Sequence, residues 1–227
     1  GLGDLLRFNA AAPMPVTVSY SPGLHDLDGD GRLDLTGTWN YAYRPGWPWD
    51  GAVVYPQTNA PFQFGDLTRL RHVAESSSDA PQFISHRYMA VDFADFNRDG
   101  KLDLVVTCRG AKTADFYINT GQVEPTGMPR YRLSQSITNV SGWQACRAVD
   151  LDGDSAVDLV VDGRYLRNEN PKSWPFRGAQ WVQLDAGKQP CFLDLDGDQQ
   201  LDSVCLQGGS TLQPDFYRVA WRRNLGG

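Results

Sequence analysis

Short apolar segments alternate with polar and turn-forming residues along the whole chain, and no stretch keeps the period of an amphipathic helix. Four of the most apolar segments, residues 33–36, 102–107, 157–161 and 201–206, each begin at the end of a strongly acidic stretch. Their length and their content of Val, Leu and Thr are typical of β-strands. The pattern therefore predicts an all-β chain of short strands and tight turns, which the 23 Gly and 14 Pro residues also favour.

The acidic stretches share one nine-residue pattern, with Asp at positions 1, 5 and 9 and Asp or Asn at position 3. We number them loop 1 (residues 26–34), loop 2 (95–103), loop 3 (150–158) and loop 4 (194–202). Calcium binds about six to eight oxygen atoms, which the side chains at positions 1, 3, 5 and 9 and the carbonyl at position 7 would supply. The sequence thus predicts up to four calcium ions, with the ligands Asp26, Asp28, Asp30, Arg32, Asp34, Asp95, Asn97, Asp99, Lys101, Asp103, Asp150, Asp152, Asp154, Ala156, Asp158, Asp194, Asp196, Asp198, Gln200 and Asp202.

These loops differ from the helix–loop–helix calcium site, which has a bidentate Glu at position 12. Position 12 is Gly37, Val106, Val161 or Cys205 here, and a predicted strand rather than a helix follows each loop. An ordinary turn uses one Asp or Asn, and several carboxylates this close repel one another unless a cation neutralises them. We therefore favour cation sites over simple solvated hairpin turns.

Each loop joins two strands into a hairpin, and about two further strands follow before the next loop, among them strands expected over residues 62–70 and 180–184. Antiparallel units of four strands are typical of β-propeller blades, which bury their faces only against neighbouring blades. We expect a single β-propeller domain or fragment over residues 1–227, with blades at 21–74, 82–138 and 144–187 and partial blades at 1–20 and 189–227.

The four loops, their flanking strands and the segment Phe-Tyr-Ile-Asn-Thr-Gly at residues 116–121 resemble the FG-GAP or VCBS-type repeats of integrin-α-like β-propellers. The resemblance covers nearly the whole chain and implies calcium in the loop between the first two strands of each blade. Two loops depart from the repeat at position 6, where Ser155 and Gln199 replace the usual Gly. Because that turn favours Gly, we expect weaker calcium binding in loops 3 and 4, or loops without metal.

Both ends of the chain resemble interior parts of blades. Residues 5–9 and 216–224 resemble third strands, and residues 15–20 resemble a fourth strand. One interpretation is a piece of a larger propeller that needs further blades. The alternative is a small closed propeller in which an N-terminal strand completes the last blade.

The richest candidate for ligand binding is the aromatic, Pro-stiffened segment at residues 39–49. Aromatic rings with polar edges suit stacking on sugar rings, so we expect carbohydrate, including acidic polysaccharide, as a partner. The alternative is that these rings fill a gap between blades. Trp143 and Trp174 could extend the site, whose candidate residues are Trp39, Tyr41, Tyr43, Arg44, Trp47 and Trp49.

A second cluster raises the question of catalysis. Arg binds carboxylates with a bidentate fork, and His or Tyr can transfer protons, as abstraction of a proton beside a uronate carboxylate would require. Because FG-GAP-like propellers include polysaccharide lyases, a lyase acting on uronate-containing glycans is one alternative, and a protein-binding adhesion module is another. Ordinary surface Arg and core His residues would also explain the cluster, whose catalytic candidates are His72, His86, Arg87 and Tyr88, with Arg69 and Arg71 nearby.

The formal net charge of −6 reflects the loops, which hold fifteen of the 27 acidic residues: four in each of three loops and three in loop 2. We find no basic cluster of the kind that binds nucleic acid and no apolar run long enough to span a membrane. Weak calcium loops fill at the millimolar calcium found outside the cytosol, so we expect an extracellular or periplasmic protein.

Four cysteines are compatible with export. Cys191 and Cys205 are equally distant in sequence from Asp198 in loop 4, so in a symmetric hairpin they would face each other, as a disulfide or as two core thiols. Cys108 and Cys146 lie in neighbouring repeats and could pair across them.

Overall fold

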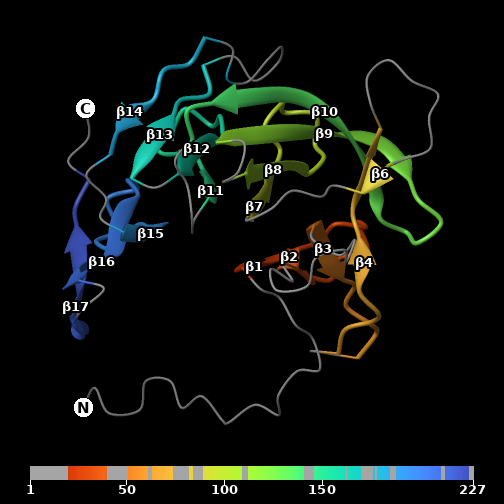
Figure 1. Ribbon diagram of the computed structural model, residues 1–227, viewed down its shortest axis with the longest axis horizontal. Coiled ribbons are helices and arrows are strands. Elements are labelled where there is room, and N and C mark those ends of the chain that lie inside the picture. The colour runs from red at the N-terminus through yellow and green to blue at the C-terminus, as the bar shows by residue number, and fades with distance from the viewer. Residues whose placement is uncertain are drawn as a thin grey trace.

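The computed structural model describes residues 20–39, 51–60, 63–73, 82–83, 89–108, 112–140, 146–161, 163–169, 176, 178–184, 188–210 and 213–224. These ranges contain seventeen β-strands in four sheets (Figure 1), and no helix is assigned within them. Accordingly, they hold no helical segment long and apolar enough to cross a membrane. The predicted all-β fold is confirmed.

The strands follow the chain from one sheet to the next, with each loop joining the first two strands of its blade. The first sheet has the order β1-β2-β3-β4, the second β6-β5-β10-β9-β8-β7, the third β11-β12-β13-β14 and the fourth β15-β16-β17. The bounds are Tyr20–His25 (β1), Asp34–Trp39 (β2), Gly51–Tyr55 (β3), Thr68–Arg69 (β4), Arg71–Val73 (β5), Gln82–Phe83 (β6), Met89–Ala94 (β7), Asp103–Cys108 (β8), Thr113–Val123 (β9), Pro129–Thr138 (β10), Cys146–Val149 (β11), Asp158–Val161 (β12), Arg164–Leu166 (β13), Val182–Gln183 (β14), Lys188–Leu193 (β15), Asp202–Ser210 (β16) and Gln213–Arg222 (β17).

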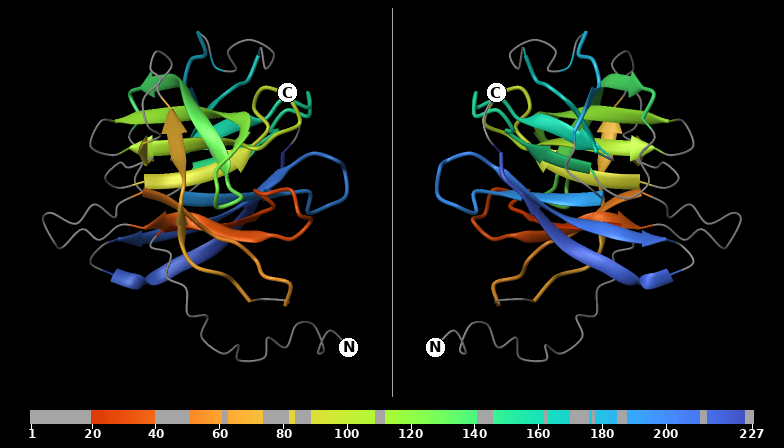
Figure 2. Two further views of the ribbon diagram at one scale, coloured as in Figure 1. Left: turned by 90° about the vertical axis from the view of Figure 1, so that its right-hand side faces the viewer. Right: turned by 90° about the vertical axis from the view of Figure 1, so that its left-hand side faces the viewer.

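The four sheets follow one another around a common axis as the blades of a propeller (Figures 1 and 2). The first strands of successive blades lie toward the middle, where β7 contacts β1 on one side and β11 on the other. The second blade therefore buries its two faces against the first and third blades, as short sheets with two apolar faces require.

The side chains of strand β8 alternate between two hydrophobic clusters. Leu104 and Val106 pack into a cluster with Val54 of the first blade. The intervening Val105 points to the opposite face and packs with Leu159 of the third blade. Because successive side chains of a strand alternate between faces, a continuous apolar run is required where a blade has a neighbour on both sides.

Three strand predictions need correction. The second sheet has six strands rather than four, because β5 pairs with β10 in parallel and β6 pairs with β5. The strand predicted over residues 62–70 is broken in its described part, residues 63–70. There Phe64 bridges to Gln57, Gly65 N–H donates to the Pro56 carbonyl, and only Thr68–Arg69 forms a strand. The strand predicted over residues 180–184 is limited to β14.

Neither of the two cysteine pairings that the sequence left open is present. Cys146, Cys191 and Cys205 are free thiols. Cys191 lies opposite Val204 rather than Cys205, because loop 4 places Leu193 opposite Asp202, one residue away from the register of a hairpin symmetric about Asp198. A shift of one residue places the two cysteines on opposite faces, so that Cys191 is exposed and Cys205 is buried.

Candidate metal centres

The first Asp of each loop organises the turn by accepting backbone hydrogen bonds. Asp26 Oδ1 accepts from Gly29 N–H (2.9 Å) and Asp30 N–H (3.1 Å), and its Oδ2 accepts from Gly31 N–H (2.9 Å). Asp194 accepts the three equivalent bonds in loop 4. In loops 2 and 3 the first Asp also accepts from position 6, at 2.7 and 2.8 Å. One carboxylate thus fixes the backbone that presents the others.

Position 6 has the same left-handed conformation in all four loops. Its φ is 85° at Gly31 and 84° at Gly100, and 67° at Ser155 and 69° at Gln199. The two departures from Gly therefore leave the turn intact, at a cost of about 1–2 kcal/mol each for an L-residue in this region. The weaker calcium binding expected in loops 3 and 4 stays a prediction.

The last Asp of each loop is buried and connects the loop to the third strand of its blade. Asp34, Asp103, Asp158 and Asp202 are at most 2% exposed. Each accepts a hydrogen bond of 2.8–2.9 Å from one main-chain N–H group of the third strand or of the residues just after it. The donor lies within the third strand in loop 2 and two residues after its end in the other loops. The donors are Gln57, Asn119, Asn168 and Asn224. These four anchor residues belong to the site but were not among the predicted ligands.

Burial disfavours ionisation of three of these four carboxylates. It raises the pKa of Asp103 to about 7 and that of Asp158 to about 6, and it also raises the pKa of Asp34. In loop 4 the hydrogen bond from Asn224 N–H dominates instead and lowers the pKa of Asp202. A cation beside the buried Asp103 or Asp158 would favour the ionised form and reverse the effect of burial.

The carboxylates converge on one another. Oxygen atoms of Asp26, Asp28 and Asp34 all lie within 4.8 Å, as do those of the equivalent residues of loops 3 and 4, Asp150, Asp152 and Asp158 and Asp194, Asp196 and Asp202. Loop 2 has Asn97 at position 3, but Asp103 Oδ2 is buried without a hydrogen-bond partner among the described residues. An all-oxygen donor set with an unsatisfied buried carboxylate oxygen fits a hard divalent cation such as calcium.

Basic side chains contact the outer carboxylates. Arg32 pairs with Asp30 in loop 1, and Lys101 Nζ lies 3.0 Å from Asp99 Oδ2 in loop 2. Arg167 contacts loop 3 and Arg223 contacts loop 4, each from the chain just after a third strand. Neither Arg167 nor Arg223 was among the predicted site residues, although both directly precede an anchor Asn.

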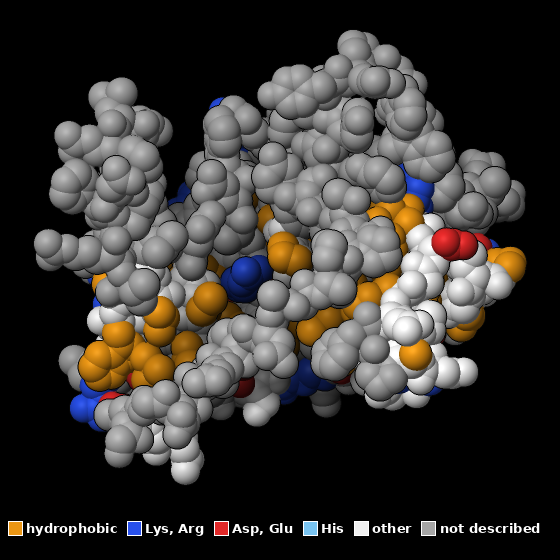
Figure 3. Space-filling model, turned by 90° about the horizontal axis from the view of Figure 1, so that it is seen from below, with side chains coloured by type: hydrophobic (Ala, Val, Ile, Leu, Met, Phe, Trp, Pro, Cys, Tyr) orange, Lys and Arg blue, Asp and Glu red, His pale blue; other side chains and the backbone are white. Residues whose placement is uncertain are grey.

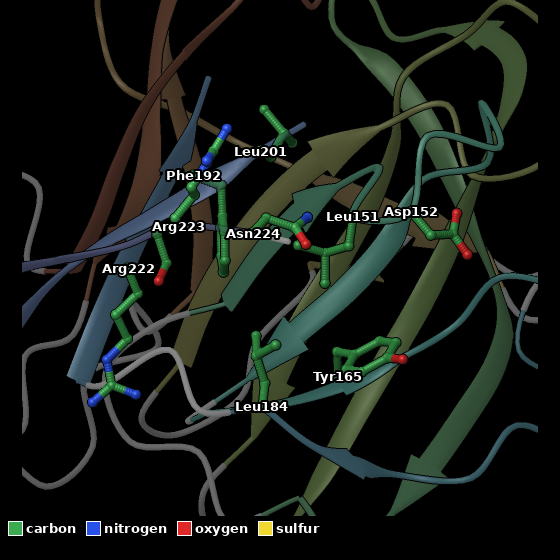
Figure 4. A pocket seen from close by; sticks show the side chains of 10 residues that line it. Leu151, Asp152, Tyr165, Leu184, Phe192, Leu201, Arg222, Arg223 and Asn224 are labelled. Carbon is green, nitrogen blue, oxygen red and sulfur yellow. The ribbon is translucent and has the colours of Figure 1, made fainter. Parts of the chain in front are cut away.

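A cavity of about 430 Å³ lies between the third and fourth blades (Figure 4). Its apolar lining comes from Leu151, Tyr165, Leu184, Phe192 and Leu201, and Arg222, Arg223 and Asn224 border it. A second hollow of about 600 Å³ shares Leu151, Asp152 and Tyr165 and extends over loops 3 and 4. On the face seen in Figure 3, apolar side chains gather in separate areas with basic groups between them.

The aromatic and catalytic candidates are not tested by the described residues. Trp39 ends β2, and the other ligand candidates, Tyr41, Tyr43, Arg44, Trp47 and Trp49, lie outside those residues, as do Trp143 and Trp174. The backbone of His72 lies in β5, opposite Tyr131 and Gln82. His86, Arg87 and Tyr88 are also outside the described ranges.

Comparisons with known proteins identify one repeat directly. A family model described as an FG-GAP-like repeat matches residues 95–161, which include loops 2 and 3. A search of the curated proteins found no match. Among solved structures, a lectin from Agrocybe aegerita, whose title describes specific recognition of non-reducing terminal N-acetylglucosamine, is 19% identical with a TM-score of 0.49. The match covers 81% of this chain but 45% of that one, so the chain spans less than half of that structure. The family match and the four sheets together identify residues 95–161 as an FG-GAP-like repeat within a β-propeller whose described residues form four blades.

Proposed function

We propose that this chain is an exported, calcium-binding β-propeller that presents a loop to carbohydrate. The observation that supports calcium binding best is the convergence of three carboxylates within 4.8 Å in each of loops 1, 3 and 4. Like charges at this separation destabilise the folded state unless a cation neutralises them. Export belongs to the same proposal, because loops of this kind fill at extracellular calcium concentrations.

Calcium fits these loops better than other common cations. The donors are carboxylate, amide and carbonyl oxygens, and the loops bring together neither the imidazole nor the thiolate groups that zinc and copper favour. Magnesium requires near-ideal octahedral geometry and keeps several of its waters, whereas calcium accepts more ligands in a less regular arrangement. The nine-residue loops offer up to five protein groups each, which favours calcium.

The test of calcium binding is isothermal titration with calcium, paired with thermal unfolding in calcium and in chelator. Ions that bind only the folded state stabilise it by mass action. A free calcium concentration of 100 times the Kd of a site therefore adds about 3 kcal/mol to the free energy of unfolding. Asp28→Ala removes an exposed ligand from loop 1 and should abolish or weaken one site. Asp66→Ala, an exposed Asp outside the loops, is the matched control. Unchanged unfolding after verified calcium removal would refute the assignment.

The carbohydrate part of the proposal rests on the aromatic segment between β2 and β3. Trp39 ends β2 and β3 begins at Gly51, so the segment leaves and re-enters the first blade as one connection. Connections of this type project from the blade ends, where propellers commonly bind ligands. Flat aromatic rings stiffened by two Pro residues suit the apolar face of a sugar.

The test of carbohydrate binding is retention on immobilised neutral and acidic glycans in the presence of calcium. We expect Trp47→Ala and Trp49→Ala to lose retention, whereas Val123→Ala, which truncates an exposed apolar side chain of β9, should leave retention unchanged. Absence of retention on every glycan would refute this part of the proposal. Ultraviolet absorbance of the same incubations would reveal new unsaturated uronate ends if the protein cleaves the glycan.

A further inference from the structure

Two arginines occupy equivalent positions in the third and fourth blades. Arg167 directly precedes Asn168, and Arg223 directly precedes Asn224. Each Asn is held at the last Asp of its loop, through a main-chain bond of 2.8 Å to Asp158 or Asp202. This bond fixes the position of the preceding Arg relative to the loop.

Each Arg spans two carboxylates of its loop, at positions 3 and 5. Arg167 Nε lies 2.6 Å from Asp152 Oδ2, and its terminal nitrogen lies 3.4 Å from Asp154 Oδ2. Arg223 makes the same contacts, 2.6 Å to Asp196 and 3.1 Å to Asp198. Repetition of one geometry in two blades argues that the guanidinium is a built-in part of these loops.

Loops 1 and 2 lack this arrangement. The residues equivalent to Arg167 and Arg223 are Pro56 and Ile118, which carry no charge. The basic side chains of these loops come from position 7, where Arg32 and Lys101 pair with the Asp at position 5. Among the described ion pairs, position 3 of loops 1 and 2 has no basic partner.

We propose that Arg167 and Arg223 are internal counter-ions that compete with calcium for the carboxylates of loops 3 and 4. The four loops then fall into two classes. Loops 1 and 2 bind calcium more tightly, whereas loops 3 and 4 bind it more weakly and keep their fold without it. This inference rests on the proposed calcium sites.

Two further observations support the division into classes. The same two loops carry the non-Gly residues at position 6, so each departs from the repeat twice. Loop 3 also receives Arg98 of loop 2, which donates to the main-chain carbonyls of Asp154 (2.9 Å) and Ser155 (3.1 Å). A fixed positive charge beside a solvent-exposed site lowers the affinity for a divalent cation by roughly tenfold.

The test is calcium titration and calcium-free thermal unfolding of Arg167→Gln and Arg223→Gln in the whole chain. Gln keeps a polar side chain but removes the charge. Each variant should bind calcium roughly tenfold more tightly at one site, because the competing charge is lost. Each should also unfold at a lower temperature in chelator, because two carboxylates lose their partner. Arg132→Gln, an exposed Arg of β10, should change neither quantity.

The outcomes distinguish failure of the proposed calcium sites from failure of the role proposed for the two arginines. Wild-type protein that binds no calcium would refute the proposed metal sites. Wild-type protein that binds calcium, with unchanged or weaker binding in both variants, would refute only the role of the arginines. Arg167→Lys keeps the charge but not the fork, so its calcium affinity should stay close to wild type. A gain as large as that of Arg167→Gln would show that charge is not the cause.

Discussion

The buried Asp103 should make the calcium-free protein less stable as the pH rises. Its carboxyl is 2% exposed, accepts one bond from Asn119 N–H (2.9 Å), and leaves Oδ2 without a described partner. Burial, together with the negative charges of Asp99 and Asp95, raises its pKa from 3.8 to about 7. Between these values the folded state holds a proton that the unfolded chain has released, so raising the pH favours unfolding.

The magnitude follows from the size of the pKa shift. Each unit of difference between the folded and unfolded states corresponds to about 1.4 kcal/mol, so a shift from 3.8 to about 7 corresponds to about 4 kcal/mol. This stabilisation is present in full below about pH 4 and is lost once the pH exceeds the folded pKa of about 7. About 3 kcal/mol of the loss falls between about pH 5 and pH 8. Calcium should remove most of this dependence, because a cation stabilises the ionised carboxylate.

The assay compares urea unfolding of wild type and Asp103→Asn at pH 5 and pH 8, in chelator. Asn keeps an acceptor for Asn119 N–H but buries an unpaired NH₂ group, which costs about 1–3 kcal/mol at both pH values and cancels in the comparison. The variant should therefore gain about 3 kcal/mol relative to wild type on going from pH 5 to pH 8. Asp66→Asn, an exposed substitution, controls for general charge effects.

Two results would refute this reasoning. A difference between wild type and Asp103→Asn that is the same at both pH values would show that Asp103 ionises normally in the folded state. The second result is a rise in the calcium-free stability of wild type from pH 5 to pH 8 that is absent in Asp103→Asn. It would show that folding lowers the pKa of Asp103 rather than raising it.

Three further predictions concern stability measured by urea unfolding in saturating calcium. Phe96→Ala should lower the free energy of unfolding by about 3–5 kcal/mol, because Phe96 is 2% exposed and its ring centroid lies 5.4 and 5.8 Å from those of two other Phe rings. A loss below about 1 kcal/mol would contradict this packing. Asn168→Ala should lower the free energy of unfolding by about 1–3 kcal/mol, since the Asn168 side-chain NH₂ donates to the carbonyls of Phe96 (3.0 Å) and Val157 (3.1 Å) and so joins two blades. Asn168→Asp cannot donate these bonds and should be at least as destabilised as Asn168→Ala. Ser155→Gly should raise stability by up to about 1 kcal/mol, because Gly relieves the left-handed strain but adds freedom to the unfolded chain; a loss would show that the strain is small.

The acidic loops and their hairpins could be predicted from the sequence because their interactions are local. The first Asp of each loop bonds to main-chain groups at most five residues away, so the pattern of nine residues contains almost everything that shapes the turn. The apolar runs after the loops predicted β2, β8, β12 and β16 for the same reason. A strand that is buried on both faces has apolar residues at consecutive positions, so its sequence alone indicates it.

The connections between distant segments came only from the tertiary structure. The anchor residues at the ends of the third strands, the parallel pairing of β5 with β10, and the offset that separates Cys191 from Cys205 all depend on the register between strands. Arg167 and Arg223 are ordinary charged residues in the sequence, and only the fold brings them onto the carboxylates of loops 3 and 4. A strand can pair in several registers of similar local preference, and the packing of whole blades against one another selects one of them.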